Sequence, residues 1–161
     1  MDNITHLRRA NPSDLASVLE LFTTTIEKVC SKDYSAEQIK VWQASADNHE
    51  RWLAKITRDE FWVAETGKFI SGFASLKNNS YIDLMYVHND FLHQGIATRL
   101  LKKMTDLASQ RLIRKITSDV SITAKPFFEK HGFKIIKENH LVLRGVAIMN
   151  FQMEFDITGE F

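Results

Sequence analysis

The sequence predicts a single-domain α/β (α+β) protein with a mixed, mostly antiparallel sheet of about six to seven strands flanked by helices. Hydrophobic residues recur at helical spacing early in the chain, and the pattern becomes extended at about Phe61. A strand–turn–helix–strand unit over residues 81–120 implies one parallel strand pair with a right-handed crossover. Because 161 residues, 44% of them hydrophobic, suffice for one core, we expect residues 1–161 to form one domain.

The first sixty residues predict one strand and three helices. Ile4–Arg9 is the opening strand, and Pro12 suits the first turn of a helix that runs to about Cys30. Ser35 is a favourable N-cap for a second helix, and Asn48–Ile56 has the apolar spacing of a third, shorter one. We expect the apolar stripes of these helices to pack against the sheet.

Turn residues and one more helix separate the remaining strands. Gly67 and the Lys77–Ser80 segment join three strands into an antiparallel meander, and Gly145 turns the final hairpin. A helix over Thr123–His131 ends at Gly132. The strands predicted after the third helix are Phe61–Glu65, Phe69–Leu76, Tyr81–Val87, Lys115–Val120, Lys134–Leu143 and Val146–Ile157.

The most informative segment runs from Tyr81 to Leu107, where a strand passes through a glycine-containing turn into an amphipathic helix. The helix begins near Gly95. Its first free N–H groups and the positive end of its dipole favour phosphate oxygens, and Gly95 and Ala97 keep side-chain bulk away from a ligand. Neither GxxxxGK[ST] nor GxGxxG occurs in the chain, so this segment predicts a pyrophosphate site of another kind.

Local charge is compatible with a phosphate ligand at this segment. Between Phe91 and Lys115 the basic residues are Arg99, Lys102, Lys103, Arg111, Arg114 and Lys115, against the single acidic residue Asp106. This excess either meets phosphates or forms a solvated helix face. The whole chain has 21 Lys and Arg against 20 Asp and Glu, which argues against a nucleic-acid-binding protein.

The composition predicts a cytoplasmic protein with no membrane partner. Cys30 is the sole cysteine, which excludes an internal disulfide, and the first ten residues lack the apolar core of a signal peptide. The apolar runs are shorter than a membrane span. Because His49 and His140 have no ligand-like spacing to other His, Cys or Asp residues, we expect no metal.

Two motifs carry a resemblance to a known family. The turn Leu92-His93-Gln94-Gly95-Ile96-Ala97 resembles the Q/R-x-x-G-x-G/A motif, and the segment from Ala124 to Phe133 resembles A-x-x-x-Y-x-x-x-G-F. Both motifs, at this separation and on the expected elements, resemble the GNAT superfamily of acyl-CoA N-acyltransferases. The C-terminal SITAKPFFEKHGF run is similar to the small bacterial YafP-type branch of acetyltransferases.

The resemblance implies transfer of an acetyl group from acetyl-CoA to a primary amine of a small molecule or peptide. The amine would attack the thioester directly, without an acyl-enzyme, in a protein that needs no metal. A second hypothesis is a non-catalytic acyl-CoA-binding sensor or interaction protein of the same fold. The sequence leaves the acceptor amine and a homodimer open.

The resemblance also implies which residues contact the cofactor, with a backbone N–H near Tyr86 or Val87 as oxyanion donor. Two positions depart from the family pattern. Leu92 replaces the usual Gln or Arg, and Phe128 stands where many members have a Tyr that protonates the departing thiolate. Phe128 either lines the site or packs in the core. The implied cofactor contacts are Met85, Tyr86, Val87, His93, Gln94, Gly95, Ile96, Ala97, Thr98, Ser121 and Phe128.

Asp83 is the candidate general base. Strict alternation along the strand places it on one face with Tyr81, Met85 and Val87. A carboxylate within such an apolar run is unusual unless it is paired or functional. Asp83 therefore either takes the proton of the amine, with Tyr81 as the second candidate, or accepts hydrogen bonds from backbone or a Lys. His88 either relays a proton or begins the turn.

Aromatic residues of the first half are candidates for the acceptor site. In the resembling fold, the segments after the first helix wall the substrate site, which brings Tyr34, Trp42 and Trp52 into range. Aromatic walls hold amines by stacking or cation–π contacts. The alternative is that Trp42 and Trp52, which lie on helical stripes, belong to the core.

Overall fold

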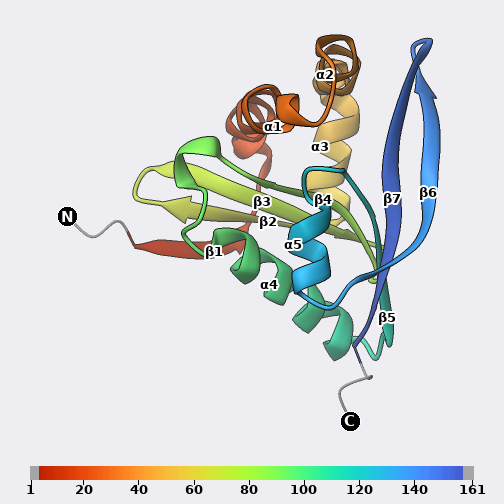
Figure 1. Ribbon diagram of the computed structural model, residues 1–161. Coiled ribbons are helices and arrows are strands. Elements are labelled where there is room, and N and C mark those ends of the chain that lie inside the picture. Colours follow the sequence, from red (N-terminus) through yellow and green to blue (C-terminus); the bar gives the residue numbers. More distant parts are fainter. Residues whose placement is uncertain (1–3, 158–161) are drawn as a thin grey trace.

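The computed structural model describes residues 4–157, and its sheet has seven strands in the order β1-β2-β3-β4-β5-β7-β6 (Figure 1). Neighbouring strands are antiparallel except β4 and β5, which are parallel. The predicted fold class, with its single parallel pair, is confirmed. The strands are β1 (Thr5–Arg9), β2 (Glu60–Thr66), β3 (Phe69–Lys77), β4 (Tyr81–Val87), β5 (Lys115–Val120), β6 (Lys134–Leu143) and β7 (Val146–Asp156).

Helices cover both faces of the sheet and create two hydrophobic cores. The first three helices pack on one face and the last two on the other (Figure 1). Phe22, Phe61 and Phe73 are fully buried in the first core, and Leu100 and Met104 in the second. The helices are α1 (Leu15–Val29), α2 (Ala36–Gln43), α3 (His49–Arg58), α4 (Ile96–Gln110) and α5 (Lys125–Lys130).

Helix starts follow the capping signals in the sequence. The Ser35 hydroxyl accepts from the Gln38 backbone N–H, and the Gln38 side chain accepts in return from the Ser35 N–H. Helix α5 is shorter than the predicted Thr123–His131 because the preceding residues form a turn, in which the Ser121 hydroxyl accepts from the Ala124 N–H. Gly132 follows α5 with φ +93°, as its predicted role as helix stop requires.

Strands β4 and β5 pair over two residues each and then separate. The pairs are Tyr81 with Thr117 and Ile82 with Ser118. Asp83 and Asp119 are therefore the first residues beyond the paired part of each strand. The opening between the strands lies in the middle of the sheet, flanked by both cores.

A β-bulge in β4 lies at the point of separation. Leu84 pairs with Ser75 of β3 and Ile82 pairs with Leu76, which leaves Asp83 as the additional residue. Ile82 therefore lies in the same core as Met85 and Val87. The prediction that Tyr81, Asp83, Met85 and Val87 share one face is wrong, because the bulge interrupts the alternation and turns Tyr81 to the opposite face.

Candidate active site

The predicted phosphate-binding turn has the geometry that ligand approach requires. Gly95 has φ +80° at the N-cap of α4, and a Cβ built on it would meet no atom within 4 Å. Space therefore remains in front of the helix N-terminus. Because the Gly95 carbonyl accepts from the Arg99 N–H, the amides of Ile96, Ala97 and Thr98 are the free first-turn donors.

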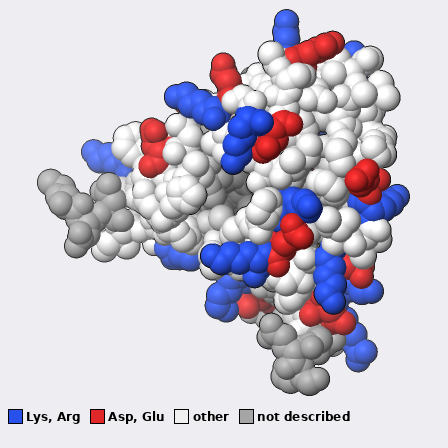
Figure 2. All heavy atoms as spheres, viewed as in Figure 1, with Lys and Arg blue, Asp and Glu red and all other residues white. Residues whose placement is uncertain are grey.

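A cavity of about 530 Å³, here called the turn cavity, lies against this helix N-terminus. Eight of the predicted cofactor residues line it, whereas the exposed Gln94 does not. Figure 2 shows a hollow near the middle of this face of the molecule. The lining residues are Met85, Val87, Phe91, His93, Gly95, Ile96, Ala97, Thr98, Ala124, Phe127, Phe128, Lys130 and His131.

The basic side chains that line the turn cavity come from segments outside α4. Lys130, His93 and His131 line it. The expectation that the basic excess of the 91–115 segment meets phosphates is not supported, because five of its six members have other partners. Arg99 donates to the Thr5 carbonyl, Lys102 pairs with Asp106, and Lys103 lies over the Trp62 ring. Arg111 pairs with Glu60, and Lys115 pairs with Glu154. This matches the solvated-face alternative.

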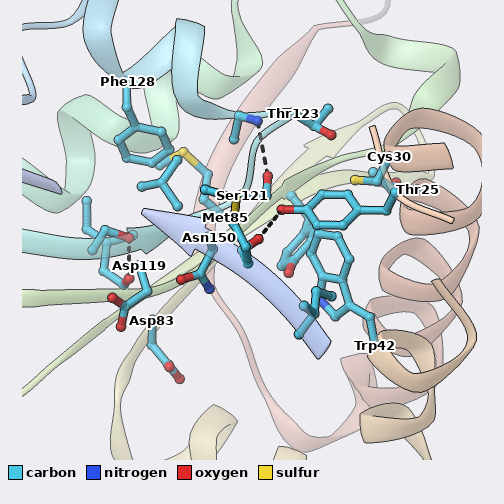
Figure 3. Close-up of a pocket in the computed structure, with 18 of the residues that line it drawn as sticks. Thr25, Cys30, Trp42, Asp83, Met85, Asp119, Ser121, Thr123, Phe128 and Asn150 are labelled. Carbon is cyan, nitrogen blue, oxygen red and sulfur yellow. Dashed lines mark hydrogen bonds between the residues drawn. The ribbon is translucent and has the colours of Figure 1, made fainter. Parts of the chain in front are cut away.

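A second cavity of about 240 Å³, here called the strand cavity, fills the opening between β4 and β5 (Figure 3). The sheet supplies most of its wall, and α1, α2 and the β6–β7 hairpin close it. Its residues are Thr25, Cys30, Tyr34, Trp42, Ile82, Asp83, Met85, Tyr86, Val87, Ser118, Asp119, Val120, Ser121, Thr123, Ala124, Phe128, Leu141, Leu143, Ile148, Met149 and Asn150.

Asp83, the predicted base, lies in the strand cavity and forms an ion pair with Lys55 of α3. The Lys55 side chain is 13% exposed and that of Asp83 is 17% exposed, so both charges are largely removed from water. The alternative that Asp83 accepts from a Lys is thus realised in the structure. Lys55 Nζ donates its hydrogen bond to the Oδ2 atom of Asp83.

Sequence reasoning did not identify Asp119, the second carboxylate of this cavity. Its Oδ2 accepts from the Tyr81 hydroxyl at 2.6 Å, and its Oδ1 accepts from the Asn139 side-chain amide at 2.7 Å. Burial, together with the hydrogen bond to Asp119, raises the pKa of Tyr81, so Tyr81 stays a donor at neutral pH. A carboxylate within the short strand Lys115–Val120 was the signal that could have identified Asp119.

Of the three aromatic candidates, Tyr34 and Trp42 line the strand cavity and Trp52 does not. Tyr34 donates to the Met149 carbonyl at 2.8 Å and accepts from the Ile122 N–H at 2.9 Å, and its ring meets Trp42 edge-on. Burial raises the pKa of the Tyr34 hydroxyl.

Trp52 belongs to the core, which was the alternative to a role in substrate binding. It is 3% exposed, its ring lies 4.7 Å from that of Phe22, and its indole N–H donates to the Ser45 carbonyl at 3.0 Å. Its position on the inner stripe of α3 directs it toward the sheet, away from the cavity.

The side chains of His88 and Cys30 have structural roles. His88 accepts from the Asp90 N–H through Nδ1 at 3.0 Å and begins the turn after β4, which was the alternative to a proton relay. Cys30 is buried in the wall of the strand cavity, and burial raises the pKa of its thiol. Neither geometry indicates a proton carrier or nucleophile.

The two cavities adjoin. Met85, Val87, Ala124 and Phe128 line both of them. Phe128 is 4% exposed and meets Phe133 edge-on at 5.0 Å, so it is at once a core residue and a wall of both cavities. A ligand lying on the helix N-terminus can therefore extend between the strands, past Asp83 and Asp119.

This fold and this pair of cavities define an acyltransferase-type α/β protein, and the chain belongs to the GNAT family: the acetyltransferase (GNAT) domain matches residues 30–155. The uncharacterized N-acetyltransferase YafP of Escherichia coli K12 is 34% identical over 155 residues, which cover 96% of this chain and 97% of YafP. Family membership places the chain among the acetyltransferases.

Solved structures have the same architecture. A GCN5-related N-acetyltransferase from Rhodopseudomonas palustris superposes with a TM-score of 0.92 at 30% identity, covering 97% of this chain and 98% of that one. The PaiA N-acetyltransferase of Thermoplasma acidophilum, solved in complex with coenzyme A, has a TM-score of 0.77 at 21% identity, with coverage of 95% and 99%.

Over residues 4–157, no group of three or more His, Cys, Asp or Glu side chains is arranged to hold a metal ion. None of the helices in that range has the length and apolar character required to cross a bilayer.

Proposed function

We propose that this protein is an N-acetyltransferase that moves the acetyl group of acetyl-CoA to a primary amine of a small molecule or peptide. The observation that carries the proposal is the junction of the two cavities. The turn cavity presents helix N–H groups suited to a pyrophosphate, and the strand cavity presents two carboxylates directly beyond it.

Cofactor binding would use the free amides of Ile96, Ala97 and Thr98 for the pyrophosphate. The open space at Gly95 supports this placement, since no side chain blocks the helix N-terminus. Lys130 lines the same cavity and adds positive charge near the phosphates. The coenzyme A complex of the PaiA relative supports the same choice of ligand.

In the proposed reaction the amine nitrogen attacks the thioester carbonyl carbon and forms the C–N bond. A backbone N–H near Tyr86 or Val87 would stabilise the oxyanion. The C–S bond then breaks as the carbonyl reforms, and a thiol with a pKa of about 8.5 leaves as the thiolate and is protonated by water. Asp83 would accept the proton that the attacking amine releases.

Calorimetry with acetyl-CoA, followed by detection of free coenzyme A with a broad amine and peptide panel, tests the proposal. Asp83→Asn should lower kcat by at least about tenfold, because the base contribution is lost, while acetyl-CoA affinity stays unchanged. Asp106→Asn, on the outer face of α4, is the matched control and should behave as the parent. Absence of binding heat would refute the proposal.

The alternative is a non-catalytic acyl-CoA binder, favoured by Phe128, which cannot donate a proton. It requires saturable acetyl-CoA binding with no coenzyme A release from any amine. Under this alternative Asp83→Asn and the parent would be indistinguishable in every assay.

The proposed site of action is the cytoplasm, where acetyl-CoA is available and the single thiol of Cys30 stays reduced. We also propose that the protein forms a homodimer through β6. This strand is an edge of the sheet and exposes Ile136 and Val142. Sedimentation equilibrium should show a dimer that Val142→Lys dissociates; a parent monomer would refute it.

A further inference from the structure

We propose that the acceptor is a compact amine with an apolar body and no carboxylate, and that Asp119 binds its ammonium group. The bound ammonium would release one proton to water before its neutral nitrogen attacks, and Asp83 would accept the second proton, which the nitrogen loses on attack. This inference rests on the proposed acetyl transfer and names the substrate class of the same site.

The charged side chains that line the strand cavity are both carboxylates, Asp83 and Asp119. They follow the last β4–β5 pair directly, and Figure 3 shows both on one side of the cavity. Their environments differ. Lys55 neutralises Asp83, whereas the hydrogen-bond donors to Asp119 are the uncharged Tyr81 and Asn139 side chains.

Asp119 is therefore the carboxylate whose charge the protein leaves uncompensated. Over residues 4–157, no Lys or Arg side chain forms an ion pair with it. Along the sheet, Asp119 pairs with Gln152 of β7, which in turn pairs with Lys137 of β6. The Cα atoms of Asp119 and Lys137 are therefore two strand spacings, or about 10 Å, apart. An ammonium group in the cavity would supply the missing positive charge.

The remaining walls are mostly apolar. The β6–β7 hairpin contributes Leu141, Leu143 and Ile148, and Trp42 stands across the cavity on α2. Because the volume is about 240 Å³ and must also admit the acetyl end of the cofactor, the acceptor has to be compact. An apolar body gains free energy by leaving water for these walls.

A carboxylate on the acceptor would be repelled. It would lie beside Asp119, and no Lys or Arg is among the residues that line the cavity. Lys55 is already engaged by Asp83. Asp119 is an exposed residue, so this repulsion acts between hydrated charges, and an unfavourable charge contact of this kind discriminates between ligands.

A matched amine series tests this inference. Coenzyme A release would be followed with 2-phenylethylamine, phenylalanine methyl ester, phenylalanine and 2-aminoethanol at saturating acetyl-CoA. The first two should be acetylated with kcat/KM at least about tenfold above that of phenylalanine, because the carboxylate is absent or masked. The short polar 2-aminoethanol should be poorer than 2-phenylethylamine, because it lacks an apolar body.

The role of Asp119 is tested by substitution. Asp119→Asn should raise KM for 2-phenylethylamine by about tenfold or more and reduce the preference for it over phenylalanine, with acetyl-CoA affinity unchanged. Asp119→Glu should recover part of the preference, and Asp106→Asn is the surface control. Circular dichroism and thermal melting would confirm that each variant is folded.

Failure of the inference is distinguishable from failure of the proposed function. Equal turnover of phenylalanine and 2-phenylethylamine, or an unchanged amine KM in Asp119→Asn, would overturn the inference and leave acetyl transfer standing. If acetyl-CoA binds and other amines are acetylated but both apolar amines are inert, the acceptor class is wrong. If the protein does not bind acetyl-CoA, both the proposed function and the inference about the acceptor are wrong.

Discussion

The hydroxyl of Tyr81 donates to Oδ2 of Asp119 at 2.6 Å and connects β4 to β5 at the end of their paired segment. The contact lies beside the cavity between these strands and fixes the position of one Asp119 carboxylate oxygen. Tyr81 therefore acts on the proposed amine site through Asp119, as a positioning residue.

Removal of this hydrogen bond should weaken amine binding. We expect Tyr81→Phe to raise KM for the amine about threefold to tenfold, which corresponds to the net contribution of a typical hydrogen bond, about 0.5–1.5 kcal/mol, without altering acetyl-CoA affinity. Because the pKa of Tyr81 is raised in the fold, the parent's pH–rate profile should show no titration of Tyr81 below pH 10. A change confined to acetyl-CoA affinity would contradict this role.

Gly95 and Gly145 provide a matched pair for the cofactor site. Both have φ +80° and no atom within 4 Å of a built Cβ, so Ala at either position should cost about 1 kcal/mol of stability through backbone strain. Gly95→Ala should also weaken coenzyme A binding by about tenfold or more, because the methyl group intrudes on the helix N-terminus. Calorimetry and urea unfolding on both variants separate the two effects; equal binding losses would refute the site.

Phe128→Tyr places a hydroxyl where many family members carry one. We expect kcat near pH 7.5 to change by less than about twofold, because a thiolate leaves without a general acid. Coenzyme A release and thermal melting would be measured together, since the buried ring tolerates little added volume. A tenfold rise in kcat would instead show that protonation of the thiolate limits the parent.

Asp14 should contribute stability that depends on pH. Arg8 donates to both of its carboxylate oxygens at 2.9 Å, which lowers the pKa of Asp14 from its usual value of 3.8. A lowered folded pKa means that the contribution is present above about pH 4 and is lost as the pH falls through the folded pKa. Asp14→Asn should therefore cost about 1.5–3 kcal/mol at pH 7.

Urea unfolding of the parent and Asp14→Asn at several pH values checks this prediction. The difference between the two proteins should shrink as the pH falls below 4. Asp106→Asn removes an exposed ion pair and should change stability by less than about 0.5 kcal/mol at every pH. A difference for Asp14→Asn that persists at low pH would show that packing, rather than charge, is responsible.

Local signals in the sequence were sufficient for most of the fold. The seven strands and the parallel pair follow from changes of periodicity and from turn residues such as Gly67 and Gly145, which act within a few neighbouring positions. The glycine turn was also predictable from the sequence, because Gly95 directly precedes the first residue of α4 and both signals lie within a few positions.

The amine side of the site depended on tertiary contacts that local patterns do not carry. One additional residue in β4, at Asp83, reverses the faces of the strand without any mark in the sequence. Asp119 gains its position from β5, which lies next to β4 in space although 36 residues separate Asp119 from Asp83. Trp42 and Trp52 have similar helical patterns, and packing alone decides which one reaches the cavity.

The wall common to both cavities, formed by Met85, Val87, Ala124 and Phe128, has a thermodynamic consequence. If acetyl-CoA repositions any of these side chains, it changes the affinity for amine, and linkage requires the amine to change acetyl-CoA affinity by the same factor. Substitutions in this wall should alter that cooperativity between the substrates. The Michaelis constant of each substrate therefore has to be measured at several concentrations of the other.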